Sequence, residues 1–329
     1  MRKTGLPGRA APGETEGRGT RRCRCRCRCR CISLYLVPRT MTLSLDHLVI
    51  AVSDLPRTIA DYTALGFQVI EGGRHPGRPT RNALVVFEDG AYLELIAWHG
   101  QGLADDRWWQ WLQAHGEGLV DFALHPGDVQ AVVERAAAGG LALEGPLDGG
   151  RARPDGELLQ WQTARAATPD LPFLCGDITP RPLRVQPGAV RQHANGVSGV
   201  ASVTLVVENL ETTLAGYQAL LGKDALQTAP LNLAGTGLRL ASLGLPAHAS
   251  EHGVAQGGTS LVLLEPDRDS RATAAQALSA VLRQRGQGLL GFALRGRLGA
   301  EALPWGSANE LPGGLTHGAL IDYQRQAGL

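Results

Sequence analysis

Two polar residues lie inside apolar stretches of the first half of the chain. His47 lies within Leu45–Val52, and Glu94 lies within Ala91–Ala97. A lone histidine in such a strand is usually a hydrogen-bonded core residue, but a buried carboxylate is costly unless it is paired, protonated or bound to a metal. Three roles for the two residues stay open: a pair of metal ligands, a metal-free anchor for a polar ligand, or an ion pair with an arginine.

The segments around these residues occur twice along the chain. Three segments recur in the same order: Leu45–Val52 as Val200–Val207, Gly90–Leu95 as Gly258–Leu263, and Gly118–Leu124 as Gly288–Leu294. Such repetition indicates two copies of one fold. The second copy has Ser202 and Val262 where the first has His47 and Glu94. This difference assigns function to the first copy and predicts a structural or dimer-forming role for the second, so a homodimer is one expectation.

The first copy begins with a β-α-β-β-β unit. Leu45–Val52 predicts a buried strand, and the helix after it begins at the capping residue Asp54 and ends at Gly66. Three more strands are expected, at Phe67–Ile70, Ala83–Phe87 and Ala91–Ala97. A linking helix over Asp105–His115 carries three tryptophans, which we expect to pack against a sheet.

A second unit of the same kind follows. Its elements are a strand at Val120–Leu124, a helix at Gly127–Ala138, and strands at Leu141–Leu143, Leu158–Gln162 and Pro172–Cys175. Val200–Leu264 predicts a third unit, and Leu289–Tyr323 a degenerate fourth with one clear strand. A four-stranded sheet with one helix buries one face only, so the units must pair. The predicted fold is α+β, with repeated βαβββ units paired into half-open, eight-stranded, barrel-like lobes.

These elements imply a division of the chain into four parts. Residues 41–180 are predicted to form a first lobe, residues 181–199 a linker rich in Pro and Gly, and residues 200–329 a second, degenerate lobe. Residues 1–40 are an Arg/Cys-rich tail with too little apolar sequence for a core, so we expect disorder there. Because Met1 and Met41 are the only methionines, the native start could be Met41.

The composition excludes several classes of protein. The formal net charge is +1, but residues 1–40 hold 11 Lys or Arg and 2 Glu, so the rest of the chain is net acidic and predicts no nucleic-acid surface. No run approaches the ~18 apolar residues of a membrane span. Cys175 is the only cysteine after the tail, which is typical of the cytoplasm. Motifs for phosphate loops, nucleophile elbows, HExxH zinc sites and dinucleotide binding are missing.

A loop before the third strand carries candidate catalytic groups. His75 titrates near neutral pH and could act as general acid or base, although a solvated loop histidine is an equal alternative. Asn82 could orient a substrate, and Thr80 could bind it. Farther on, Arg153 could clamp a substrate carboxylate, but an ion pair with Asp155 or Glu157 is equally open.

Five motifs of the first half occur in an order that resembles a known family. They are Leu45-Asp46-His47-Leu48, Gly73–Arg78 running into Thr80-Arg81-Asn82, Tyr92–Leu95, Arg151–Gly156 and Leu171-Pro172-Phe173. On these motifs the first half resembles the glyoxalase-like domain family of the vicinal oxygen chelate superfamily, which includes glyoxalase I, extradiol dioxygenases and bleomycin-resistance proteins. Pro79 departs from the pattern, since a glycine is usual before Thr80.

The resemblance implies a divalent metal ion held by the first and last strands of each unit. Those positions are His47 and Glu94 in the first unit, Asp121 on the first strand of the second, and a residue within one or two of Cys175 on its last. A catalytic site usually has three protein ligands and an open position. His47, Glu94 and Asp121 are therefore the predicted metal ligands.

The resemblance also implies two alternative functions. The first is a metal-dependent enzyme, a lyase, isomerase or dioxygenase, that acts on a small oxygenated metabolite and uses His75 and Asn82 for proton transfer and orientation. The second is a protein that binds or sequesters a small molecule without chemistry, as the resistance proteins of the superfamily do. Both functions predict a small molecule as the partner. No nucleic-acid or membrane partner is expected.

Overall fold

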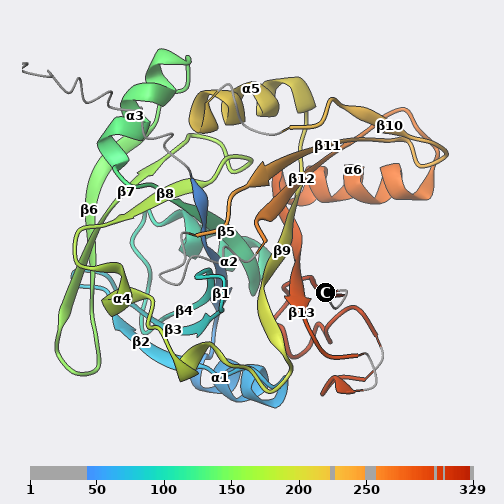
Figure 1. The fold of residues 1–329 in the computed structure, drawn as a ribbon. Coiled ribbons are helices and arrows are strands. Elements are labelled where there is room, and N and C mark those ends of the chain that lie inside the picture. The colour runs from blue at the N-terminus through green and yellow to red at the C-terminus, as the bar shows by residue number, and fades with distance from the viewer. Residues whose placement is uncertain (1–42, 223–226, 249–256, 300–301, 307, 327–329) are drawn as a thin grey trace, which may run out of the picture. The chain divides into compact units, whose positions relative to one another are not determined.

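The computed structural model describes residues 43–222, 227–248, 257–299, 302–306 and 308–326 (Figure 1). The predicted tail, residues 1–40, lies outside these ranges, and the described residues belong to one compact unit. No helix within the described ranges is long and apolar enough to cross a membrane.

Eight strands of the first half close into a barrel, in the order β1-β4-β3-β2-β6-β7-β8-β5 (Figure 1). The strands are β1 (Ser44–Val52), β2 (Ile70–Arg74), β3 (Thr80–Val86), β4 (Tyr92–Trp98), β5 (Gly118–His125), β6 (Glu144–Ala152), β7 (Leu158–Arg165) and β8 (Phe173–Asp177). We call this barrel, with its helices, the first lobe. The predicted pairing of the first two βαβββ units is confirmed, and the barrel that they form is closed.

Each of the first three units positions its helix with the same capping device. The helices are α1 (Leu55–Ala64), α3 (Val129–Ala138) and α5 (Leu210–Leu221). The side chains of Asp54, Asp128 and Asn209 accept hydrogen bonds from the first turn of these helices, at 3.1, 3.1 and 2.8 Å. A side-chain oxygen at this position satisfies an amide that has no partner within the helix. A further helix, α2 (Arg107–His115), links the two units of the barrel.

The second half forms a six-stranded sheet in the order β10-β11-β12-β9-β13-β14 (Figure 1). Its strands are β9 (Val197–Val206), β10 (Leu231–Leu233), β11 (Leu238–Leu245), β12 (Thr259–Pro266), β13 (Gly288–Gly296) and β14 (Ile321–Arg325). We call this sheet, with α5 and α6 (Thr273–Arg285), the second lobe. Within the described ranges its last unit contributes only β13 and β14, one strand more than the single clear strand expected from its sequence.

Matching β-bulges relate the units to one another. In the antiparallel β1–β5 pair the extra residues are Asp46 on β1 and Val120 on β5, and each comes directly before a predicted metal ligand. In the β9–β13 pair the extra residues at the corresponding places are Ala201 and Leu290, and Ser198 forms a further bulge. A bulge re-aims the residues beside it. The register therefore confirms that Ser202 occupies in the second lobe the place that His47 occupies in the first.

Two strand predictions for the first lobe are wrong in position. The strand expected at Leu141–Leu143 begins instead at Glu144, and the strand expected at Phe67–Ile70 begins at Ile70. Both observed strands, β6 and β2, contain adjacent glycines and little apolar alternation. They pair with each other at the seam between the two units. Backbone pairing rather than side-chain burial defines them, so hydrophobic periodicity does not locate their ends.

The segment between the lobes, residues 178–196, has structure of its own. It contains the short helix α4 (Arg181–Arg184) and one 3-10 turn (Ala189–Arg191). We call it the connecting segment. Arg184 and Asn195 are buried within it. The region predicted as a linker is therefore packed against the first lobe.

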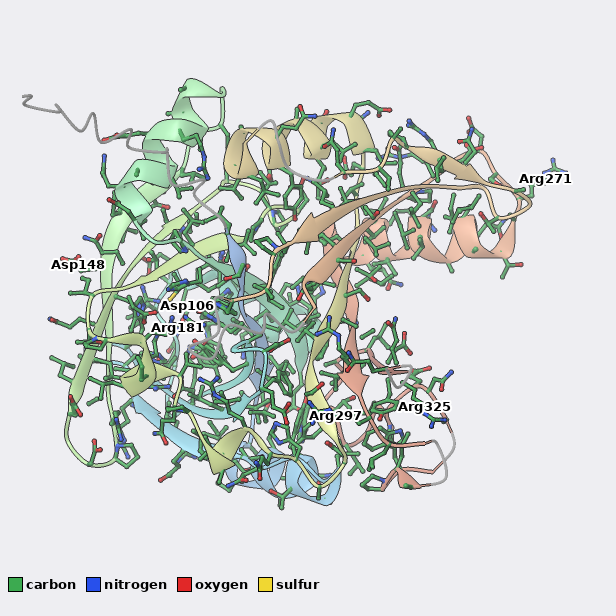
Figure 2. All side chains as sticks on the ribbon, in the orientation of Figure 1. Asp106, Asp148, Arg181, Arg271, Arg297 and Arg325 are labelled. Atoms are coloured by element: carbon green, nitrogen blue, oxygen red, sulfur yellow. The ribbon has the colours of Figure 1, made fainter. Side chains whose placement is uncertain are left out.

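The two lobes contact each other at the turn between β3 and β4. The Asp89 carboxylate accepts a hydrogen bond from the Val200 amide at 2.9 Å, and Arg295 lies 3.7 Å from it. Arg297, labelled in Figure 2, forms an ion pair with Glu88. One continuous apolar core includes residues of both lobes. The second lobe is thus part of the support of the barrel.

Candidate active site in the first lobe

A cavity of about 510 Å³ lies in the barrel and contains most of the predicted site residues. His47, His75, Thr80, Asn82 and Glu94 line it. Asp106 and Asp148, labelled in Figure 2, are also among the lining residues. The volume is within the range of small-molecule sites. The barrel therefore brings together five predicted site residues that span 47 positions of the sequence, from His47 to Glu94.

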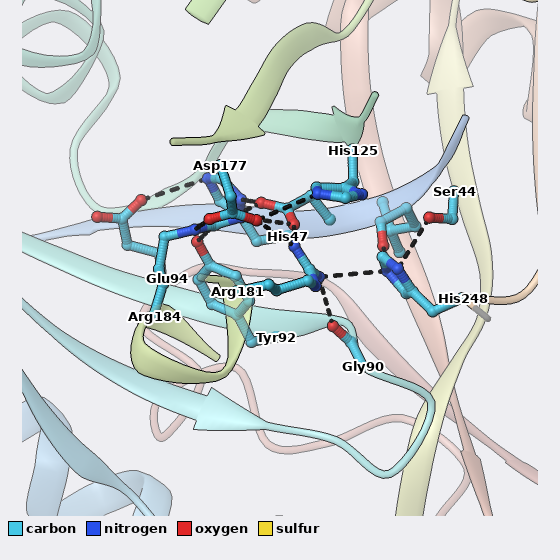
Figure 3. Close-up of polar contacts among 12 residues, drawn as sticks. Ser44, His47, Gly90, Tyr92, Glu94, His125, Asp177, Arg181, Arg184 and His248 are labelled. Atoms are coloured by element: carbon cyan, nitrogen blue, oxygen red, sulfur yellow. Dashed lines mark hydrogen bonds and ion pairs between the residues drawn. The ribbon is translucent and has the colours of Figure 1, made fainter. Parts of the chain in front are cut away.

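His47 and Glu94 face each other across neighbouring parallel strands. His47 on β1 pairs in register with Tyr92 on β4, so Glu94 follows two positions later on the same face of the sheet. His47 Nε2 lies 3.5 Å from Glu94 Oε2 (Figure 3). This separation is longer than a normal hydrogen bond, so both atoms stay available to a third group.

The other face of His47 is fixed by a buried ionic cluster. His47 Nδ1 lies 2.7 Å from Asp46 Oδ2, and the ring stacks on Tyr92 at a centroid distance of 4.6 Å. Arg184 donates to Asp46 at 2.8 and 3.1 Å and to the Tyr92 hydroxyl at 2.7 Å (Figure 3). Burial alone would raise the pKa of Asp46, but the guanidinium groups of Arg184 and Arg181 hold it well below its usual range.

Three predicted residues surround Glu94. Asn82 Nδ2 donates to Glu94 Oε1 at 2.6 Å, and His75 Nε2 lies 3.7 Å from the same oxygen. The Thr80 hydroxyl holds His75 Nδ1 at 2.9 Å, so Thr80 orients the imidazole. Burial lowers the pKa of His75, against the attraction of Glu94. The neutral form of His75 is therefore favoured at neutral pH, where it can accept a proton.

The Asp121 carboxylate, a metal ligand implied by the resemblance, is occupied by other contacts. Its carboxylate accepts hydrogen bonds from Arg107 and, at 2.8 Å, from the Trp108 indole nitrogen. It also accepts from the Phe122 amide at 2.9 Å. Burial raises the pKa of Asp121, against the opposite effect of Arg107. A residue of the linking helix α2 thus neutralises this carboxylate.

The register identifies the fourth position that the resemblance implies. Phe173 on β8 pairs with Ala123 on β5, as Glu94 on β4 pairs with Val49 on β1. Val49 and Ala123 each lie two positions after the predicted ligand of their own strand. Phe173 is therefore the equivalent of Glu94, and its ring lies 5.3 Å from that of His47.

These side chains do not fit a metal centre with three protein ligands. Of the four equivalent positions, His47 and Glu94 carry open donors, Asp121 is held by Arg107, and Phe173 has no donor. Within the described part of the chain, no three His, Cys, Asp or Glu side chains converge on a common point suited to an ion. Catalytic metal sites usually have three such ligands. The metal role of Asp121 stays a prediction, which its ion pair with Arg107 does not favour.

The arginine in the cavity is not the one expected from the sequence. Arg153 forms ion pairs with Asp155 at 2.7 Å and Glu157 at 3.8 Å, and it is not among the lining residues. Of the two roles open for Arg153, a clamp for a substrate carboxylate and an ion pair with its acidic neighbours, the structure shows the ion pair. Arg151, two positions earlier, is buried and lines the cavity.

Several supporting residues have no sequence signal of their own. Arg181 and Arg184 lie in the connecting segment, which the sequence predicts only as a linker. The second lobe contributes His248, whose Nδ1 contacts the Ser44 hydroxyl at 2.9 Å and whose Nε2 lies 3.4 Å from Arg181 (Figure 3). Burial is the main cause that lowers the pKa of His248 to about 3. Only the adjacency of Asp46 to His47 was visible in the sequence.

Comparison with known proteins agrees with this architecture. A family model described as a glyoxalase-like domain matches residues 45–221, which is more than half of the chain. A hypothetical protein from Staphylococcus aureus is 13% identical, with a TM-score of 0.58 over 86% of this chain and 100% of that one. A variant of 4-hydroxymandelate synthase from Streptomyces coelicolor is 16% identical, with a TM-score of 0.51 over 78% of this chain and 72% of that one.

At these identities the two structures show likeness of fold alone. No curated protein is significantly similar to the chain. The family match extends from the barrel through the connecting segment to the end of α5. The paired βαβββ units, the cavity inside their barrel and this match lead to one conclusion. The chain belongs to the glyoxalase-like domain family of the vicinal oxygen chelate superfamily.

Proposed function

We propose that the first lobe is the active site of an enzyme that transfers a proton on a small oxygenated metabolite, as a lyase or isomerase does. One observation supports this most strongly. The Nε2 atoms of His47 and His75 lie 3.5 and 3.7 Å from the two carboxylate oxygens of Glu94, inside a cavity. A carboxylate flanked by two imidazoles is a suitable general base, and a neighbouring neutral imidazole can accept the proton from it and return it.

Each of these residues has a distinct part in the proposed reaction. Glu94 removes a proton from a carbon next to a carbonyl, and Asn82 holds its Oε1 at 2.6 Å. Asp46 accepts from His47 Nδ1, so the opposite nitrogen is directed at Glu94 and at the substrate. His75, neutral because it is buried, takes up or returns a proton on the other side. Such groups contribute about 10²–10⁴-fold each to a rate.

A divalent ion would supply Lewis-acid chemistry to this reaction, but the donor set does not support a step through one. The alternative function is a binding protein without chemistry. The incomplete set of metal ligands favours this alternative. Phe173 stands at one equivalent position and Arg107 holds Asp121 at another, so the site departs from the expected ligand set.

Solvent-exchange measurements distinguish the two functions. The full chain is incubated in D₂O with a panel of 2-oxo acids, 2-hydroxy ketones and hydroxyaldehydes, and proton NMR follows the exchange of C–H for C–D. We expect exchange by the wild type and a loss of about 100-fold or more in Glu94→Gln. Binding of panel members without exchange, seen as saturable shifts of ligand signals, would establish the binding function instead.

A further inference from the structure

Five arginines line the cavity; Arg78 is exposed to solvent, and three of the others have acidic partners. Arg184 pairs with Asp46 and Asp177, Arg107 with Asp121, and Arg165 with Glu144. Their charges are therefore neutralised within the protein. This is the usual state of a charged group that is removed from water.

Arg151 is different from these three. Its side chain is buried, with a residue exposure of 4%, and it forms no ion pair with any described carboxylate. Its single hydrogen bond, from Nη1 to Asn82 Oδ1, is long at 3.4 Å, and its Nε has no partner. Glu94 attracts this guanidinium from beyond ion-pair distance and compensates its burial only in part. A buried guanidinium without a contacting carboxylate destabilises the fold unless something that binds there neutralises it.

A glycine on the neighbouring strand leaves space for this guanidinium. Gly72 on β2 lies across the seam between the units, where a Cβ would stand 2.7 Å from Arg151 Nη1 and 2.1 Å from Asn82 Oδ1. Any other residue would displace both polar groups. The side chain of Arg151 therefore occupies space that the neighbouring strand leaves open.

We infer that Arg151 is the anchor for a carboxylate group of the ligand, so that the cavity takes a small organic acid carrying one negative charge. A guanidinium binds a carboxylate with two parallel hydrogen bonds. Glu94 faces the same cavity and would repel a second negative charge, which disfavours phosphate esters and dicarboxylates. This inference rests on the proposed function, because it places the acid group beside the proposed base.

The rest of the cavity indicates the body of the ligand. Trp108, Trp161, Phe173 and Tyr92 line it. The Trp161 ring lies 6.1 Å from that of His75 in an edge-on arrangement, and the Trp108 ring lies 5.7 Å from that of Phe173. Aromatic walls of this kind favour flat apolar groups. The inferred ligand is therefore an aryl or similarly flat carboxylic acid.

The test compares an acid with its uncharged isostere on the full chain. Isothermal titration calorimetry measures the binding of 3-phenylpropionate, 3-phenylpropionamide and inorganic phosphate, and a series from benzoate to 4-phenylbutyrate allows for chain length. We expect the best acid to bind about 10- to 100-fold more tightly than its amide, as charge-assisted hydrogen bonds imply. Equal binding of acid and amide, no binding by any acid, or tighter binding of phosphate would overturn the inference.

Three variants locate the effect at Arg151. Arg151→Gln is expected to lower acid affinity to the level of the amide, and Arg151→Lys to retain part of it. Arg153→Gln is the matched control, since that arginine is paired outside the cavity, and it should bind like the wild type. Acid affinity unchanged in Arg151→Gln contradicts the inference. If Arg151→Gln does not fold, the comparison between wild type, Arg151→Lys and Arg153→Gln decides in its place.

Two further measurements separate this inference from neighbouring explanations. Arg151→Met should keep or raise the melting temperature, because it removes an uncompensated charge, whereas a structural arginine would lower it. His47→Gln should lose proton exchange and keep acid binding. If the wild type binds acids selectively but shows no proton exchange, the proposed reaction is wrong and the inference about Arg151 stands. If the wild type shows exchange but does not prefer acids to amides, the inference about Arg151 is wrong and the proposed reaction stands.

Discussion

The two lobes share one framework and differ at four equivalent positions. In the first lobe these positions carry His47, Asp121, Glu94 and Phe173, and in the second Ser202, Gly291, Val262 and Asp322. The bulges before the first two positions are present in both lobes. The backbone geometry that aims these residues is thus retained where the chemistry is not. The fold supplies four positions, and the side chains placed there determine whether a lobe can act on a ligand.

The supporting cluster is also confined to the first lobe. Asp46, the bulge residue of β1, is fully buried between His47 and Arg184, whereas the bulge residue of β9 is Ala201. The second lobe instead contributes His248 to the cluster of the first. The comparison therefore describes an active lobe and a supporting one, and four measurements examine that division.

The largest effect on turnover is expected when His47 is replaced by alanine and compared with the same replacement of Ser202, its equivalent in the second lobe. His47→Ala should lower turnover by about 10²–10⁴-fold, because the acid–base partner of Glu94 is removed. Ser202→Ala, the same change at the equivalent position, should leave turnover within about 2-fold of the wild type. Steady-state rates on the substrate found by solvent exchange provide the comparison. Equal losses in both variants would mean that the second lobe shares the reaction.

A large loss of stability is expected when the buried cluster loses its central cation. Arg184→Ala leaves Asp46 and Asp177 without their main partner, so the free energy of unfolding should fall by about 3–5 kcal/mol. The control is Arg268→Ala in the second lobe, whose exposed pair with Glu208 spans 3.6 Å and should matter by less than about 1 kcal/mol. Urea denaturation measures both. A small loss in Arg184→Ala would contradict a structural role for the cluster.

The contact between the lobes should depend on pH in a defined direction. Burial, the largest cause, raises the pKa of Asp89 to about 6, although the Ala91 and Val200 amides oppose it. A carboxyl with a raised pKa contributes stability that is complete below its unfolded value of 3.8 and is lost as pH rises through about 6. Relative to Asp89→Asn, the wild type should therefore lose about 2–3 kcal/mol between pH 4 and pH 7.

Urea denaturation of both proteins across this range measures the effect. The difference between them removes the contributions of other groups, such as Asp46, whose pKa is shifted downward. A difference that does not change with pH would show that the pKa of Asp89 is not shifted by folding, and burial at the junction would not govern its protonation.

The smallest effect is expected from removal of metal ions. Dialysis against EDTA should leave the melting temperature of the wild type within about 1 °C of its value before dialysis. An ion that binds only the folded state raises the melting temperature, but a site with two protein donors binds an ion weakly. A drop that Zn²⁺ or Mn²⁺ restores in the wild type but not in His47→Ala would instead establish a metal centre on His47 and Glu94, and the first lobe would differ from the second by a cofactor as well.

Much of the architecture was predictable because it depends on local pattern. The repeated segments, the apolar strands β1, β4 and β5, and the cap at Asp54 are all determined by neighbours within a few residues. Hydrophobic periodicity and capping are visible at that range. The same holds for His47 and Glu94, because a polar residue inside an apolar strand is conspicuous wherever the strand packs.

Other features depend on contacts between residues far apart in the sequence, which no local pattern contains. Arg153 and Arg151 are alike as sequence, and only the β2–β6 seam places one in the cavity and the other in an ion pair with Asp155. Arg107 reaches Asp121 because α2 packs beside β5. Side-chain type and spacing determined which groups could do chemistry here, and the three-dimensional fold decided which of them meet, since the energy of a charge depends on the partners within a few ångströms of it.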